Sequence, residues 1–260
     1  MTTDATPAIA DGGTAGAATS GARPEDGHHA QGEGAFLRHH FDTPSQQFES
    51  AKLGMWLFLA QEILFFSGLF VAYGIYRNWY PQVFSLGSHL LDWRLGALNT
   101  VVLLFSSLTV ALAVRSAQLG KRVQVRWYLV VTILCALGFM VVKFIEYEHK
   151  FHVGFGPGIW FAPTSHGVEE IQHALEKAHH LELSGVPFHL RSFLGIYFMM
   201  TAVHGLHVLV GIGILLWILV RNERGEFGPK YFTPVELSAL YWHLVDLIWI
   251  YLFPLLYLID

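Results

Sequence analysis

Long apolar runs alternate with shorter polar segments along this chain. The first run covers residues 53–76, and Glu62 is its only acidic or basic residue. About 20 apolar residues, each rising about 1.5 Å along a helix, cross the ~30 Å hydrocarbon core of a bilayer. Four more runs of this kind lie at residues 95–114, 127–145, 192–220 and 239–259. The pattern predicts an all-α bundle of five transmembrane helices.

The residues before the first run have a different character. Residues 1–50 are rich in Ala, Gly, Thr and Ser and have no periodic apolar face. We expect a disordered tail there and a single transmembrane domain over residues 51–260. The tail does not resemble a secretory signal, because the first apolar run begins only after residue 50 and continues for a full span.

Composition agrees with a membrane protein and excludes several other classes. Of the 260 residues, 53% are hydrophobic and only 14% are charged. The formal net charge of −4 offers no basic surface for nucleic acid. The single cysteine, Cys135, allows neither an internal disulfide nor a Cys-based haem attachment.

The longest segment between spans covers residues 150–191 and carries a helical pattern of its own. Apolar residues recur there at helical spacing, at Val168, Ile171, Leu175 and Ala178. The spacing predicts a short amphipathic helix over residues 165–180. Four histidines accompany it, His166, His173, His179 and His180. Their spacing is unlike the usual ligand signatures, so we expect no metal site in this chain.

Five spans place the two termini on opposite sides of the membrane, and basic residues indicate which side is which. Ten Lys and Arg residues lie in the tail, the second loop and the fourth loop, against six on the other side. Cytoplasmic loops carry the excess of positive charge. We therefore expect a bacterial-type plasma-membrane protein with a cytoplasmic N-terminus and an outer C-terminus.

Polar residues inside the spans are the candidate functional groups. Glu62, His204 and His207 lie roughly midway along their spans, where an ionisable group should face protein rather than lipid. We expect them to hydrogen-bond to one another, either as a proton-related site or as a neutral structural group. Asn99, Glu146, His243 and Asp246 are candidates for helix packing or lipid contact. We expect His243 and Asp246, three residues apart, to form a hydrogen-bonded pair.

Several stretches together resemble subunit III of cytochrome c oxidase, in the haem-copper oxidase family. The stretches are GMWLFLAQEILFFSGLF, LNTVVLLFSS, the EY pair at Glu146, HGLHVLVG and YWHLVDLIWIYLF. They occur in family order and cover most of residues 52–260. Gln61 stands where the family usually has serine, and the family's usual first two helices have no counterpart among the five spans.

The resemblance implies a subunit without catalytic residues, haem or copper of its own. It implies packing beside the catalytic subunit I, with subunit II in the same complex, and support of enzyme stability and proton uptake. In the family, carbodiimides attack the carboxylate that matches Glu62, and phospholipids occupy a cleft whose form here is altered by the missing helix pair. The segment 150–191 is a further departure and is a docking candidate for an extra subunit.

Three alternatives remain open at this point, and one of them is a structural assembly subunit with no effect on turnover. The corresponding subunit of a quinol oxidase is also similar, since the electron-donor site lies in other subunits. A stand-alone proton or solute carrier would use Glu62, His204 and His207, but the chain lacks the internal repeats and the matched broken helices that are common in transporters.

Overall fold

The computed structural model describes residues 41–177 and 186–259. The elements, in order, are α1 (Pro44–Trp79), α2 (Pro81–His89), α3 (Trp93–Gln118), α4 (Arg122–His152), the short 3₁₀ helix η1 (Gly158–Trp160), α5 (Ser165–Lys177), α6 (Val186–Glu223) and α7 (Thr233–Tyr257). The described residues contain no β-strand, only two isolated bridges. The predicted all-α class is confirmed.

Five of these helices, α1, α3, α4, α6 and α7, are long and apolar enough to cross a membrane. The prediction of five spanning helices is therefore confirmed. The helices extend beyond the apolar runs because polar residues at the run ends continue the helical backbone. α1, for example, begins at Pro44, inside the segment expected to be tail, and its N-cap Thr43 accepts a hydrogen bond from the backbone of Gln46. The rest of the tail, residues 1–40, lies outside the described part of the chain.

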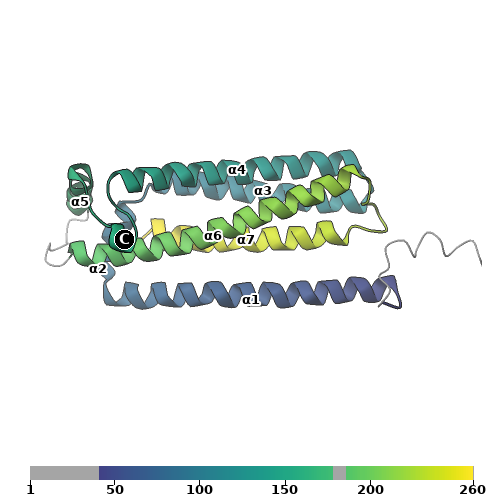
Figure 1. Cartoon of the computed structure of the whole chain (residues 1–260), viewed down its shortest axis with the longest axis horizontal. Coiled ribbons are helices and arrows are strands. Elements are labelled where there is room, and N and C mark those ends of the chain that lie inside the picture. The colour runs from purple at the N-terminus through teal and green to yellow at the C-terminus, as the bar shows by residue number, and fades with distance from the viewer. Residues whose placement is uncertain (1–40, 178–185, 260) are drawn as a thin grey trace, which may run out of the picture.

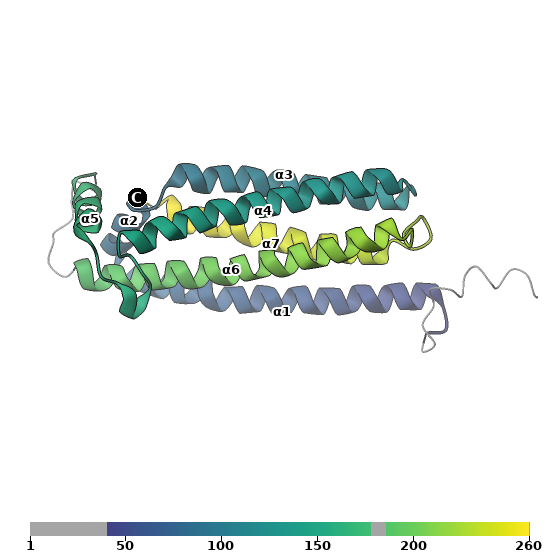
Figure 2. The ribbon, with the colours of Figure 1, turned by 45° about the horizontal axis from the view of Figure 1, so that its top comes forward.

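The four helices α3, α4, α6 and α7 form a closed bundle with antiparallel neighbours, and α1 lies along one side of it (Figures 1 and 2). α1 is in contact with α6 and α7. Only 17% of its apolar window is buried inside the molecule, against 50% for α7. α1 therefore presents most of its apolar surface outward, to lipid or to another subunit.

Aromatic side chains fill the interior of the bundle. Trp242, Trp249 and Tyr197 are among its largest fully buried side chains. Close helix contact requires a glycine at Gly211, where an added Cβ would lie 2.6 Å from the Trp242 ring. This packing sets the spacing of α6 and α7, the two helices that face α1.

Two short helices, α2 and α5, lie at the end of the bundle near the C-terminus (Figure 1). The segment between the first two spans contains α2, which Pro81 opens at its first position. Lys150 donates a hydrogen bond to the carbonyl of Leu90, just after α2. Ser88 of α2 donates to the carbonyl of Ile259 at 2.7 Å, which ties the end of the chain to this cap.

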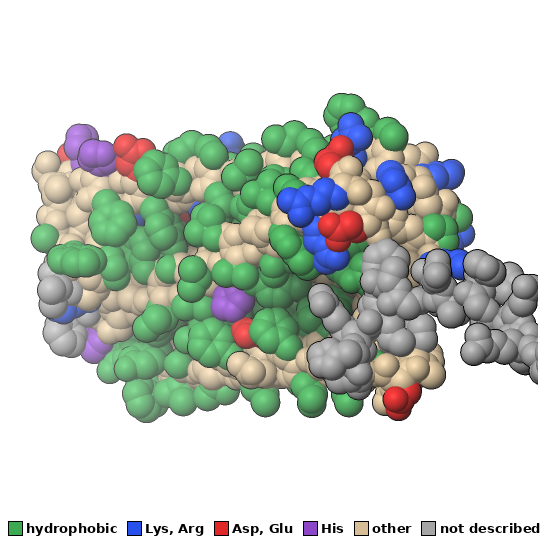
Figure 3. Space-filling model, turned by 45° about the vertical axis from the view of Figure 1, so that its right-hand side comes forward, with side chains coloured by type: hydrophobic (Ala, Val, Ile, Leu, Met, Phe, Trp, Pro, Cys, Tyr) green, Lys and Arg blue, Asp and Glu red, His purple; other side chains and the backbone are tan. Residues whose placement is uncertain are grey.

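The surface divides into an apolar middle and polar ends. Hydrophobic side chains cover most of the middle of the face shown in Figure 3, and Lys and Arg side chains gather toward one end. A bilayer-embedded bundle has this distribution, because lipid solvates the middle and water solvates the ends.

Candidate functional site

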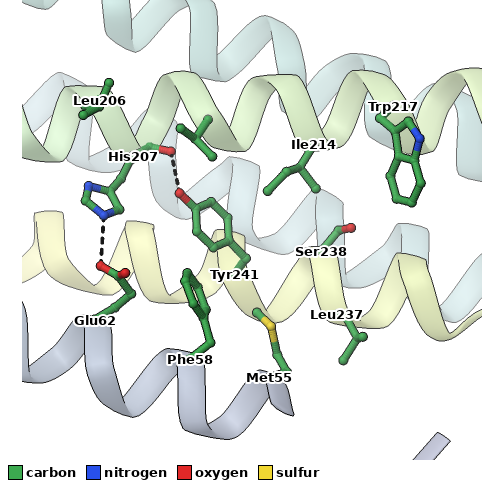
Figure 4. Close-up of a pocket in the computed structure, with 11 residues that line it drawn as sticks. Met55, Phe58, Glu62, Leu206, His207, Ile214, Trp217, Leu237, Ser238 and Tyr241 are labelled. Atoms are coloured by element: carbon green, nitrogen blue, oxygen red, sulfur yellow. Dashed lines mark hydrogen bonds and ion pairs between the residues drawn. The ribbon is translucent and has the colours of Figure 1, made fainter. Parts of the chain in front are cut away.

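A groove of about 510 Å³ lies between α1, α6 and α7 (Figure 4). Its lining is almost entirely apolar, with Glu62, His207, Ser238 and the Tyr241 hydroxyl as the polar exceptions. The lining residues are Met55, Phe58, Glu62, Leu206, His207, Val210, Ile214, Trp217, Leu237, Ser238 and Tyr241. An apolar groove with a few convergent polar groups is the usual form of a small-ligand site.

Glu62 of α1 and His207 of α6 meet at this groove. The Glu62 Oε2 and His207 Nε2 atoms are 3.0 Å apart. The other ring nitrogen of His207, Nδ1, is 2.8 Å from the carbonyl oxygen of Val203. A carbonyl oxygen only accepts hydrogen bonds, so we assign the proton on Nδ1 as the donor to Val203.

That assignment leaves one proton between Glu62 and His207. If the imidazole is neutral, Nε2 is an acceptor and the carboxyl group of Glu62 must donate. If the imidazole is charged, Nε2 donates to an ionised carboxylate. The pair is electrically neutral overall in both cases, which suits a depth where an isolated charge is costly.

The surroundings fix the imidazole in this position. The rings of Phe66 and His207 pack edge to face at 5.1 Å between centroids, and Phe65 lies 6.2 Å away. Tyr241 of α7 donates a hydrogen bond of 3.0 Å to the carbonyl of His207 (Figure 4). The side chains of His207 and Glu62 remain 18% and 12% exposed, so the pair borders the groove rather than the closed interior.

The expected grouping of Glu62 with both imidazoles is only half correct. His204 is fully buried inside the four-helix bundle, between the rings of Phe139 and Trp249. Neither of its ring nitrogens has a hydrogen-bond partner among the described residues. Three residues turn a helix by about 300°, so His204 and His207 differ by about 60° around α6 and enter different environments.

The expected bond between His243 and Asp246 is also absent. The Nδ1 atom of His243 lies 2.6 Å from the Ser107 hydroxyl of α3. Both carboxyl oxygens of Asp246 are buried without a partner of good hydrogen-bond geometry among the described residues, although the Ser107 hydroxyl lies near them. His243 therefore has its hydrogen-bond partner on α3 rather than at Asp246.

Glu146 belongs to a buried polar network that connects three helices. Its Oε2 atom is 2.8 Å from the Lys143 ammonium, and its Oε1 atom accepts hydrogen bonds from the hydroxyls of Tyr197 and Tyr257 at 2.8 and 2.6 Å. Lys143 also donates to those two hydroxyls, at 3.0 and 2.9 Å. The ion pair is thus fully hydrogen-bonded and links α4 to α6 and α7.

Sequence analysis missed the other members of this network. It named Glu146 but counted Lys143, near the end of the third span, only among the six basic residues of the outer side. A signal was present, because an acidic residue three positions after a lysine at the edge of an apolar run predicts a local ion pair. Tyr197 and Tyr257 carried no such signal, since their positions depend on how α6 and α7 pack against α4.

The histidines near the C-terminal end of the bundle form separate pairs with glutamates. His149 of α4 lies 2.9 Å from Glu170 of α5, and His166 and His173 each pair with a glutamate three residues further along α5. His179 and His180 lie outside the described residues. Within residues 41–177 and 186–259, no group of three or more His, Cys, Asp or Glu side chains is placed to hold a metal ion.

The chain is similar to known proteins that are named as subunit III of a respiratory oxidase. The family model described as cytochrome c oxidase subunit III matches residues 28–190 and 177–260. Cytochrome c oxidase subunit 3 of Loxodonta africana is 31% identical over 234 residues, which cover 86% of this chain and 74% of that protein. Quinol oxidase subunit 3 of Bacillus spizizenii is 28% identical over 80% of this chain and 86% of its own. The chain therefore belongs to the cytochrome c oxidase subunit III family, and is a multi-pass membrane subunit of a haem-copper respiratory oxidase.

Proposed function

We propose that this chain is the non-redox subunit III of a proton-pumping oxidase, where it stabilises subunit I and sustains proton uptake. The observation that carries the proposal is the 3.0 Å contact between Glu62 and His207 at the edge of an apolar groove. A pair of this kind suits a supporting role, because it supplies a polar, neutral group at mid-depth without a redox centre. Haem and copper belong to the partner subunits in this proposal.

The outward apolar surfaces supply contacts for those partners. α1 exposes large side chains on several sides, including Trp56, Leu64 and Val71, at 60%, 73% and 61%. The outer side of α3 exposes Val101 and Phe105 at 64% and 52%. In this proposal subunit I contacts either the α1 surface or the α3 surface, and lipid contacts the other one. Subunit II belongs to the same complex. The segment 150–191 is the docking candidate for an additional subunit.

The groove between α1, α6 and α7 is proposed to hold a phospholipid acyl chain. Its volume of about 510 Å³ and its apolar lining suit a hydrocarbon chain. The polar edge at Glu62 and His207 lies at the groove rather than inside the bundle, so an acyl chain would shield the pair from water.

The proposed orientation keeps the N-terminus in the cytoplasm. The six basic residues assigned to the outer side include Lys143 and Lys150, and both are buried at 6% and 3% exposure. Their charges contact Glu146 and the Leu90 carbonyl rather than lipid headgroups. The surface excess of positive charge on the N-terminal side is therefore larger than the sequence count implies.

Cytochrome c is the proposed electron donor, and quinol is the alternative. Relatives named for cytochrome c oxidase and for quinol oxidase both match over at least 80% of this chain. Oxygen uptake by the purified complex, with reduced cytochrome c or quinol as the only donor, decides between them.

Removing the chain from the complex tests the supporting role. We expect a complex without this chain to retain its haem spectrum and its initial oxygen consumption. Its proton uptake should be slower or its working life shorter, because subunit I has lost a neighbour. Unchanged proton uptake and unchanged activity through prolonged turnover would refute the proposal.

A further inference from the structure

Three polar side chains inside the four-helix bundle have no hydrogen-bond partner of good geometry among the described residues. They are Asn99 of α3, His204 of α6 and Asp246 of α7. The Ser107 hydroxyl lies near the Asp246 carboxyl group but does not meet hydrogen-bond geometry with it. The exposed fractions of the three residues are 1%, 0% and 2%. Buried polar groups in proteins are nearly always hydrogen-bonded, either to protein or to ordered water, so these three require partners.

Trp249 is the common neighbour of the three. The His204 ring lies 5.3 Å from the Trp249 ring, centroid to centroid. The indole Nε1 of Trp249 donates a 3.1 Å hydrogen bond to the hydroxyl of Thr100, the residue next to Asn99. Asp246 precedes Trp249 by three residues, which is about one turn of α7. The three residues therefore lie around the same part of the interior, on α3, α6 and α7.

The donor and acceptor types of these groups restrict what can bind there. The Asn99 amide and the His204 ring each contain an N–H donor as well as an acceptor, and the Asp246 carboxyl group adds acceptors. A metal cation satisfies acceptors only and would leave the N–H donors unpaired. An occupant that both donates and accepts hydrogen bonds fits the whole set, and water is the smallest one.

We propose that the region around Trp249 is an internal water-binding site, in which bound water joins Asn99, His204 and Asp246. The site is distinct from the groove, since His204 and the groove residue His207 lie in different environments. It adjoins the Lys143–Glu146 network, because the Lys143 ammonium lies 5.3 Å from the centre of the Trp249 ring. Bound water would thus add a polar link between the Lys143–Glu146 network and Asn99 of α3.

Substitution of Asp246 in the assembled oxidase tests the proposal, because the direction in which the release temperature of this chain changes depends on whether water is bound. If water joins the three groups, Asp246→Leu removes one partner and leaves the others unpaired, so the complex should lose this chain at a temperature lower by several degrees. Asp246→Asn retains hydrogen bonding and should release the chain close to the wild-type temperature. If the groups have no water, Asp246→Leu removes an unpaired polar group and raises the release temperature. A release temperature for Asp246→Leu equal to or above the wild-type value overturns the proposal.

Radiolytic labelling of the wild-type complex tests the site without any substitution. X-rays generate hydroxyl radicals from bound water in place, and these radicals modify adjacent side chains. Trp249 and Trp242 form a matched pair, because both lie on α7 and both are 0% exposed. Trp242 donates its indole N–H to Ser106 and packs on Gly211. We expect labelling of Trp249 several-fold faster than that of Trp242, whereas equally slow labelling of both overturns the proposal.

Discussion

At the residue scale, the Glu62–His207 contact shows how an acid and a base share a membrane interior. A buried charge without a partner is expensive, and the helix carbonyl of Val203 fixes which nitrogen of His207 remains for Glu62. The position of Glu62, midway along its apolar run, predicted that its side chain would contact a polar partner. It did not predict which imidazole Glu62 would meet, because that choice depends on the rotation of α6 against α1.

The substitution Glu62→Gln tests whether this acid affects the redox centres. Its amide can donate to Nε2 of a neutral His207, so we expect the contact between α1 and α6 to persist. Haem content and the initial rate of oxygen reduction should be unchanged, because no redox group belongs to this site. Absorption spectra and oxygen uptake of the purified complex measure both. Loss of the haem spectrum from a fully assembled variant would contradict this expectation.

At the element scale, apolar runs identified the five long helices because each run is long enough to cross a bilayer. The same reasoning underestimated their lengths, since polar residues at the ends of α4 and α6 remain helical. α2 was not predicted, because its nine residues form no apolar run and include Pro81 and Gly87. Proline suits the first position of a helix, and a Cβ added at Gly87 would lie 2.3 Å from the Phe193 ring.

The ion pair of α4 makes a prediction about stability. Lys143→Met leaves the Glu146 carboxylate buried without its cation, and breaking a buried pair in this way costs about 3–5 kcal/mol. The double substitution Lys143→Met with Glu146→Leu removes both charges and should cost clearly less. Denaturant unfolding of the chain in detergent, compared with wild type, measures both free energies. A double variant less stable than Lys143→Met would be the contrary result.

The contact between α6 and α7 makes a second prediction, with a control on the same helix. Gly211→Ala places a methyl group against the Trp242 ring and should destabilise the chain by about 1–3 kcal/mol. Gly213→Ala meets nothing within 4 Å and should be neutral or stabilising by up to about 1 kcal/mol. The same unfolding assay compares the two. Equal effects of the two substitutions would show that the Trp242 contact is unimportant.

At the scale of the whole molecule, α1 is joined to the bundle at separate points along its length. Lys52 pairs with Glu236 at 3.2 Å, Glu62 with His207 at 3.0 Å, and the Tyr73 hydroxyl bonds to the Leu255 carbonyl. The sequence predicted the helix but not these partners, because each contact joins residues more than 140 positions apart. Long-range pairs of this kind depend on how the helices assemble.

The distribution of basic residues predicts the topology of the chain in the cell. The N-terminal tail should be cleaved by protease only in inside-out membrane vesicles, because its side carries the surface excess of Lys and Arg. Immunoblotting with antibody against an epitope fused to the C-terminus, which should be accessible in right-side-out vesicles, provides the complementary measurement. Cleavage of the tail in sealed right-side-out vesicles would reverse the orientation.

The neutral character of the Glu62–His207 pair has a consequence for energised membranes. Moving one elementary charge through 100 mV corresponds to about 2.3 kcal/mol. A unit that carries one proton and no net charge gains no such energy when the voltage changes. The transmembrane voltage therefore acts strongly on this pair only when the pair gains or releases a proton, because a proton shift between Glu62 and His207 crosses only a small fraction of the membrane field.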